Sequence, residues 1–213
     1  MDQEEIPDLW LREIGKKHVK ISTENEPYEA SKKLKEFREK DGLEFVGKGS
    51  SRYVYRLSNV EPAHIVKFPI QTEFRKGTNC NKVELYIWSA LTQRYGDSAG
   101  TYDSIKGRFT PVVRGERHGR WLVMKELEET SDANDPEQKK NAILNQLPYL
   151  PHNCEFLLPD NIGFYRGEKH NETGYRIFDY GSYIPRIFLE TELGIEHINH
   201  IENNINGDLI VDS

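Results

Sequence analysis

The spacing of hydrophobic side chains divides the chain into helical and extended stretches. Ala30, Leu34 and Phe37 recur on one helix face, opposite a face of Lys and Glu. This pattern predicts a helix that opens near Pro27 and closes at the pair Asp41-Gly42. Residues 1–27 mix charged and scattered hydrophobic positions, which predicts a leader that packs loosely on the body of the protein.

A strand-like pattern follows the first helix. The predicted strands, separated by turn-forming segments, are residues 43–47, 53–57, 65–69, 110–114 and 120–127. A helix over about residues 79–94 lies between the third strand and the fourth. The order predicts an α+β fold in which the first three strands are antiparallel and two further strands follow the helix.

The second half of the chain reads as mainly helical. Asp135 and Pro136 open a helix that the prolines at 148 and 151 close, and a hairpin follows at residues 162–165 and 175–178. Hydrophobic residues among charges in the tail, from 187 to 201, predict a helix that docks on the body of the protein or on a partner. The predicted divisions are 1–42, 43–128 and 129–213.

Composition narrows the classes of partner. The chain has 213 residues and a net charge of −6, with Lys and Arg spread along it, so a nucleic-acid partner is not expected. Neither a signal-peptide pattern nor an apolar run of membrane-spanning length is present, which predicts an intracellular protein without a membrane partner. The two cysteines, Cys80 and Cys154, lie far apart and indicate no disulfide framework.

Three features of the first half could bind a nucleotide. Gly47, Gly49 and Ser50 form a turn between two strands, where backbone amides can approach phosphate, although a plain hairpin has the same pattern. Lys67 lies in an apolar strand, where a buried ammonium needs an anionic partner unless it reaches water at an edge. Glu84 on the following helix is the carboxylate expected to pair with it, the alternative being a solvent-facing glutamate.

Two oxygen ligands are predicted at one end of the hairpin. Asn161 precedes the first hairpin strand, and Asp179, in the sequence Asp-Tyr-Gly, follows the second. An amide oxygen and a carboxylate suit Mg²⁺ carrying a polyphosphate. Taken alone, Asp-Tyr-Gly is also an ordinary turn.

The order of these parts, over residues 45–182, resembles the protein-kinase-like superfamily. The resemblance implies a five-stranded N-lobe with one helix, a reduced helical C-lobe, and ATP and Mg²⁺ as cofactors. It implies that Lys67, Glu84 and Asp179 serve catalysis and that Asn161 and Asp179 hold the metal. The residues implied to line the nucleotide site are Gly47, Gly49, Ser50, Val54, Lys67, Met124, Glu126 and Leu127. Such compact chains suit a virus or a prokaryote, with a place in the cytoplasm, or in the virion or host cytoplasm.

The resemblance breaks at the catalytic loop. The family's catalytic aspartate lies five residues before its metal-binding asparagine, and Phe156 occupies that position here. Glu155 and Asp160 are the nearby acids, but neither has the register of the missing base. Arg52 replaces the third loop glycine, where it would either contact phosphate or block its approach.

Three functions follow as open alternatives. The first is a protein that binds Mg·ATP with weak or absent phosphotransfer, the second a pseudokinase scaffold, and the third an active atypical phosphotransferase acting on a protein or a small molecule. The tail or the N-terminal helix is the expected surface for a protein partner. His197 and His200 could share a helix face and bind a metal, but a solvated polar face is the more common reading of that spacing.

Overall fold

A computed structural model gives the fold of the chain. The structure describes residues 8–25, 27–41, 43–57, 63–70, 77–96, 104–127, 135–166 and 172–212. The chain forms two compact units, the first comprising Met1–Lys82 and Val112–Glu126, the second Val83–Pro111 and Leu127–Ser213. No helix in the described ranges has both the length and the apolarity needed to cross a membrane.

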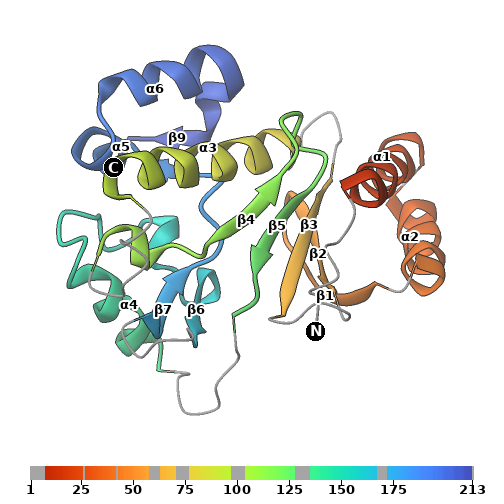
Figure 1. Cartoon of the computed structure of the whole chain (residues 1–213), viewed down its shortest axis with the longest axis horizontal. Coiled ribbons are helices and arrows are strands. Elements are labelled where there is room, and N and C mark those ends of the chain that lie inside the picture. Colours follow the sequence, from red (N-terminus) through yellow and green to blue (C-terminus); the bar gives the residue numbers. More distant parts are fainter. Residues whose placement is uncertain are drawn as a thin grey trace. The chain divides into compact units, whose positions relative to one another are not determined.

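The first unit contains the predicted five-stranded antiparallel sheet, in the order β1-β2-β3-β5-β4 (Figure 1). The α+β class and this sheet are confirmed. Each strand pairs with its neighbours in antiparallel register, with irregularities at Phe45/Gly47 and Val112/Arg114. The strands are β1 (Glu44–Lys48), β2 (Arg52–Leu57), β3 (His64–Pro69), β4 (Val112–Gly115) and β5 (Leu122–Lys125).

Two N-terminal helices, α1 (Asp8–Glu24) and α2 (Pro27–Asp41), lie side by side on one face of this sheet (Figure 1). The prediction of a loosely packed leader was wrong, because Leu11 and Ile14 of α1 are buried in the same core as the sheet. Gly15 allows the close approach, since a Cβ there would lie 2.9 Å from the carbonyl oxygen of Arg120. Helix α1 is therefore an integral layer of the first unit.

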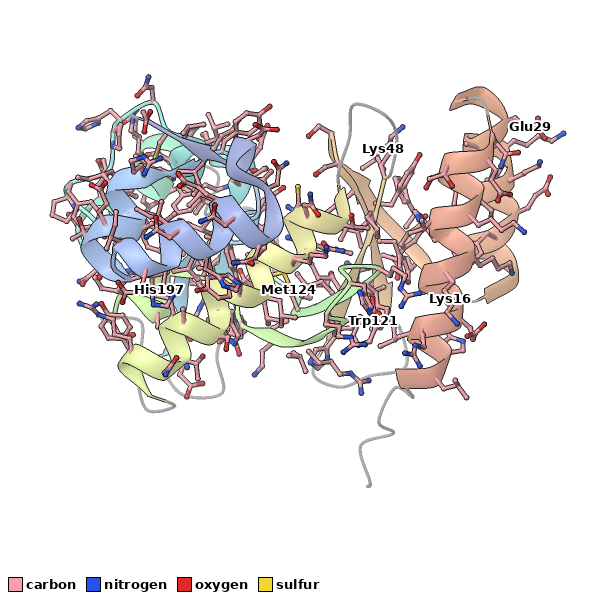
Figure 2. All side chains as sticks on the ribbon, turned by 90° about the horizontal axis from the view of Figure 1, so that it is seen from above. Lys16, Glu29, Lys48, Trp121, Met124 and His197 are labelled. Atoms are coloured by element: carbon pink, nitrogen blue, oxygen red, sulfur yellow. The ribbon has the colours of Figure 1, made fainter. Side chains whose placement is uncertain are left out.

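Alternation along the strands produces the face that these helices cover. Tyr53 and Tyr55 of β2 and Val66 and Phe68 of β3 point to the same side and are buried there with Trp121. Figure 2 shows Trp121 on the side of the sheet that faces α1 and Met124 on the other side. The side chains of the alternate residues in each strand therefore point to the opposite face of the sheet.

His18 of α1 is enclosed in this aromatic core. Its ring stacks on Phe68 at 5.1 Å and meets Phe37, Tyr53 and Tyr55 edge-on. Burial lowers the pKa of His18 from 6.5 to about 3, because the charged imidazolium would be desolvated there. The side chain is therefore neutral in the folded protein at physiological pH.

This burial predicts acid sensitivity of the first unit. As the pH falls below 6.5, the unfolded chain protonates His18 before the folded one does, so stability decreases from pH 6.5 toward pH 3. The loss expected at pH 5 is about 2 kcal/mol, measured as the change in unfolding free energy between pH 7.5 and pH 5. His18→Leu should lose less stability over this interval, whereas His118→Leu, at an exposed position, should behave as wild type. Equal pH dependence in wild type and His18→Leu would contradict the assignment.

The long helix α3 (Gly77–Tyr95) begins in the first unit and continues in the second. Its start packs closely on the sheet, since a Cβ at Gly77 would lie 2.1 Å from the carbonyl oxygen of Ser51. The side-chain nitrogen of Asn81 donates to the carbonyl oxygens of Lys67, at 3.2 Å, and Gly119, at 2.9 Å. Asn81 is buried and thus joins the helix to β3 and to the β4–β5 turn.

The second unit combines short helices with two small pairs of strands. The predicted helix opening at Asp135 is confirmed, and the Asp135 side chain accepts from the N–H of Glu137 at its start. Strands β6 and β7 form the predicted antiparallel hairpin, whereas the parallel pair β8·β9 has no counterpart in the prediction. The main elements are α4 (Pro136–Leu144), β6 (Ile162–Tyr165), β7 (Gly174–Ile177), β8 (Ile184–Pro185), α5 (Arg186–Glu192), α6 (Ile195–Ile201) and β9 (Ile210–Val211). Short helical turns are η2 (Lys106–Arg108), η4 (Glu155–Leu157), η5 (Pro159–Asn161), η7 (Glu202–Asn206) and η8 (Gly207–Leu209).

The tail forms two helices where one was predicted. Gly194 interrupts the pattern with φ of +112°, a conformation that glycine adopts without the strain other residues would incur. Helix α5 is anchored at Glu192, whose carboxylate accepts from the hydroxyls of Tyr95, at 2.6 Å, and Tyr149, at 2.5 Å. Burial, followed by the hydrogen bond to Glu192, raises the pKa of Tyr95 to about 12. The tail therefore packs within the second unit.

Candidate functional site

The glycine turn of the first unit is open around its glycines. A Cβ at Gly47 would meet nothing within 4 Å, and one at Gly49 would come no closer than 3.9 Å, to the carbonyl oxygen of Arg52. Neither glycine has a positive φ, so neither packing nor backbone conformation requires them. The N–H of Gly49 donates to Arg52 at 2.9 Å, while Ser50 is exposed. The turn thus has the free space that a phosphate would need.

Val54, Lys67 and Met124 share the sheet face opposite the aromatic core. Val54 is the register partner of Lys67, which in turn pairs with Leu122 on β5, so the three side chains form one row across the sheet. Met124 lies two positions after Leu122 and points to the same side (Figure 2). Alternation therefore aligns three residues that the sequence analysis assigned to the nucleotide.

Lys67 is almost entirely buried, with 2% of its surface exposed. This excludes the alternative of an edge-strand lysine that reaches water, since β3 is the central strand of the sheet. A buried ammonium is stable only beside acceptors or an anion. Arg52 is buried too, with Nη1 3.5 Å from Oδ1 of Asn81, so the residue at the third glycine position packs against the start of α3.

Glu126 and Leu127, which the resemblance implies to line the nucleotide site, make contacts of their own. The carboxylate of Glu126 accepts three hydrogen bonds from Arg56, and its N–H donates to Ala63 at 3.0 Å. Any contact of Glu126 with adenine would therefore use its carbonyl oxygen. In the second unit, Leu127 packs on Gly163, where a Cβ would lie only 2.6 Å from Leu127 Cδ1. Gly163 was not among the predicted site residues, and its only sequence signal is a glycine inside a predicted strand.

Glu84 and the Asp-Tyr-Gly turn meet in the second unit. Glu84 is fully buried, and its Oε1 accepts from the N–H of Tyr180 at 3.0 Å. The Tyr180 hydroxyl in turn donates to the carbonyl oxygen of Thr110 at 3.0 Å. The alternative of a solvent-facing glutamate is therefore wrong. A helix residue and a turn far apart in sequence are joined by a direct hydrogen bond.

Asn161 and Asp179 lie at the same end of the β6–β7 hairpin. The N–H of Phe178 donates to the carbonyl oxygen of Asn161 at 3.0 Å, which places Asp179 one residue beyond the contact. The side-chain nitrogen of Asn161 donates to Glu155, at 2.9 Å to its carbonyl oxygen and 3.2 Å to Oε2. The amide oxygen of Asn161 and the carboxylate of Asp179 are the groups suited to Mg²⁺. The described residues contain no group of three or more His, Cys, Asp or Glu side chains that could hold a metal ion.

Phe156, at the position of the missing base, is a core residue. Its ring is fully buried and packs on Phe109 and Phe188 at 5.8 and 5.4 Å between centroids. Tyr180 joins the same cluster through Phe109. Burial also raises the pKa of the neighbouring Cys154 thiol, so a thiolate nucleophile is disfavoured there. The loop thus directs the Phe156 side chain into the core, at the position where the resemblance would require a catalytic aspartate.

The two tail histidines contact an aromatic side chain of α3. The Tyr86 hydroxyl lies 2.9 Å from Nδ1 of His197, and its ring stacks on His200 at 4.4 Å. Figure 2 shows His197 on α6, directed toward α3. These contacts account for the histidine spacing without a metal, and the expected solvated face is instead partly packed.

No model of a known protein family matches the chain, and no curated protein sequence matches it either. The resemblance to kinases therefore stays a prediction supported by the residues themselves. Within the first unit the structure aligns Val54, Lys67 and Met124 on one sheet face. Within the second it joins Glu84 to the Asp179 turn and brings Asn161 to the same hairpin end.

Proposed function

We propose that this chain binds Mg·ATP as a kinase-like protein. Lys67 contacts the phosphates, Glu84 orients the charged groups, and Asn161 and Asp179 hold the metal. Val54, Met124 and Leu127 contact the base, and the open Gly47–Gly49 turn lies over the phosphates. The observation that carries the proposal is the hydrogen bond from the Tyr180 N–H to buried Glu84, because it links two parts of the motif series that sequence proximity does not.

This hydrogen bond fixes both the Glu84 carboxylate and the backbone of the turn that carries Asp179. A fully buried carboxylate needs donors, and the turn that carries Asp179 supplies one of them. Since Asp179 precedes Tyr180 directly, the same contact limits where its carboxylate lies. Phe156 in the core weighs against fast phosphoryl transfer through the usual loop aspartate, so the proposed activity is binding with slow transfer.

Thermal unfolding with and without Mg·ATP tests this proposal. A ligand that binds only the folded chain at 100 times its Kd stabilises it by about 2.7 kcal/mol, which raises the midpoint by several degrees. Asp179→Asn should remove the Mg²⁺-dependent part of this shift, and Lys67→Met should weaken it in the presence or absence of Mg²⁺. Asp208→Asn, at an exposed position of the same unit, is the matched control.

The outcome separates binding from a scaffold. An unchanged midpoint at millimolar Mg·ATP, confirmed by calorimetric titration without detectable heat, would refute nucleotide binding and favour the pseudokinase scaffold. A shift that Asp179→Asn leaves intact would refute the metal assignment alone.

A further inference from the structure

Glu155 and Asn161 form a closed contact on the loop that precedes β6. Both N–H groups of an Asn side chain can donate, and here Nδ2 donates to the carbonyl oxygen and to Oε2 of the same glutamate. With its nitrogen engaged in this way, the Asn161 amide presents its oxygen at the other end of the group. The contact therefore fixes a carboxylate beside a candidate metal ligand.

The geometry of η4 explains why Glu155 takes this position. In a 3-10 turn successive side chains point about 120° apart, because three residues complete one turn. Phe156 and Leu157 are both buried in the core of the second unit, while Glu155 is half-buried. Because the Phe156 ring is held in the core, the side chain of Glu155, one residue earlier, points out of the core and toward Asn161.

From this contact we infer that Glu155 is the general base of phosphoryl transfer, replacing the aspartate that Phe156 displaces. The inference rests on the proposed binding of Mg·ATP. The acceptor oxygen forms a bond to the γ-phosphorus, and the bond from that phosphorus to the β,γ-bridging oxygen breaks. The electron pair of the broken bond leaves with ADP, and the proton of the acceptor hydroxyl passes to the Glu155 carboxylate.

Glu155 fits this role better than Asp160, the other acid of the loop. Asp160 is exposed, and both donors of the Asn161 amide are used by Glu155. Within the described part of the chain, no residue hydrogen-bonds to Oε1 of Glu155, which leaves that oxygen to accept a proton. Glu155 thus differs from Asp160 in its direct contact with the candidate metal ligand Asn161.

Three variants of the full chain test the inference. Turnover is measured as labelled phosphate released to water, and as label transferred to the chain, from γ-labelled Mg·ATP. Glu155→Gln keeps an oxygen that accepts from Asn161 but removes the base, so kcat should fall about 10²–10⁴-fold. The KM and Kd for Mg·ATP and the unfolding midpoint should stay close to the wild-type values. Glu155→Asp should retain part of the rate, and Asp160→Asn should equal wild type.

The binding measurement separates the possible failures. If Mg·ATP binds but kcat of Glu155→Gln equals that of wild type, or if wild type releases no phosphate above background, the base assignment is overturned while the proposed binding stands. A parallel rise in the Kd for Mg·ATP would show that Glu155 only supports Asn161 and would also overturn it. If wild type does not bind Mg·ATP, the proposed function fails and the inference fails with it.

Discussion

Replacing Phe156 by Asp is expected to unfold the second unit rather than to create a catalytic base. The ring is fully buried between Phe109 and Phe188, so its removal alone costs about 3–5 kcal/mol. A carboxylate at this position would be desolvated without a partner, which adds to the loss or forces the group to stay protonated. Urea unfolding monitored by circular dichroism, with hydrogen exchange to locate the change, measures the effect.

Phe156→Leu is the control for the aromatic cluster. It keeps an apolar side chain of smaller volume and should lose distinctly less stability than Phe156→Asp. Protection of the Phe188 amide should fall in the aspartate variant and persist in the leucine variant. A Phe156→Asp protein with the wild-type urea midpoint would show that this side chain is not part of the core. A gain of phosphotransfer in Phe156→Asp would support the resemblance's placement of the catalytic aspartate five residues before Asn161.

Asn81→Leu is expected to have the second large effect, on the first unit. The change removes both donors and leaves the carbonyl oxygens of Lys67 and Gly119 without them in a buried place. Each unsatisfied buried polar group costs about 1–3 kcal/mol, so the expected loss is roughly 2–5 kcal/mol. Equilibrium urea unfolding followed by tryptophan fluorescence measures it, because Trp121 lies in the core of the same unit.

A surface position on the same helix provides the comparison. Ser89 is exposed on α3, and Ser89→Ala should change stability by less than about 0.5 kcal/mol. The proposed binding of Mg·ATP should also be weaker in Asn81→Leu, because the Asn81 side chain holds the main chain of Lys67. If Asn81→Leu unfolds at the same urea concentration as wild type, the two hydrogen bonds make no net contribution to the free energy of unfolding.

The sheet was predictable because its pattern is local. Alternation of Tyr53 with Val54 and of Val66 with Lys67 indicates strands with two different faces, and the structure pairs them in this register. Glycine and asparagine turns mark the strand ends. The predicted boundaries differ from the observed ones by a residue or two at most strands, because strand ends depend on the neighbouring chain as well as on local preference.

Other parts of the fold depend on contacts that no local pattern encodes. The docking of α1 rests on Gly15 and on a buried His18, and both residues read as ordinary in the sequence. The parallel pair β8·β9 joins two-residue strands that lie far apart in the chain. The break of the tail at Gly194 follows a positive φ, which a hydrophobic pattern cannot indicate.

In the candidate site, too, some features could be predicted from local sequence and others depend on contacts between distant residues. The residue types of Lys67, Glu84 and Asp179 and their order were visible in the sequence, because charged groups stand out in apolar or turn surroundings. The contacts of Asn81 were not visible, and Glu155 could be named from the sequence only as a nearby acid, because a side-chain direction and a hydrogen-bond partner define each contact. The sequence around these two residues would look the same if their side chains were exposed and made no contacts.

The α1–α2 layer limits how the chain can be shortened. A protein beginning at Leu43 would keep every strand of the sheet but would expose the aromatic face now covered by the two helices. Contiguous apolar surface of this kind promotes self-association and precipitation. Domain boundaries for expression therefore belong before Asp8, and a fusion partner is better attached at the N-terminal end of α1 than between α2 and β1.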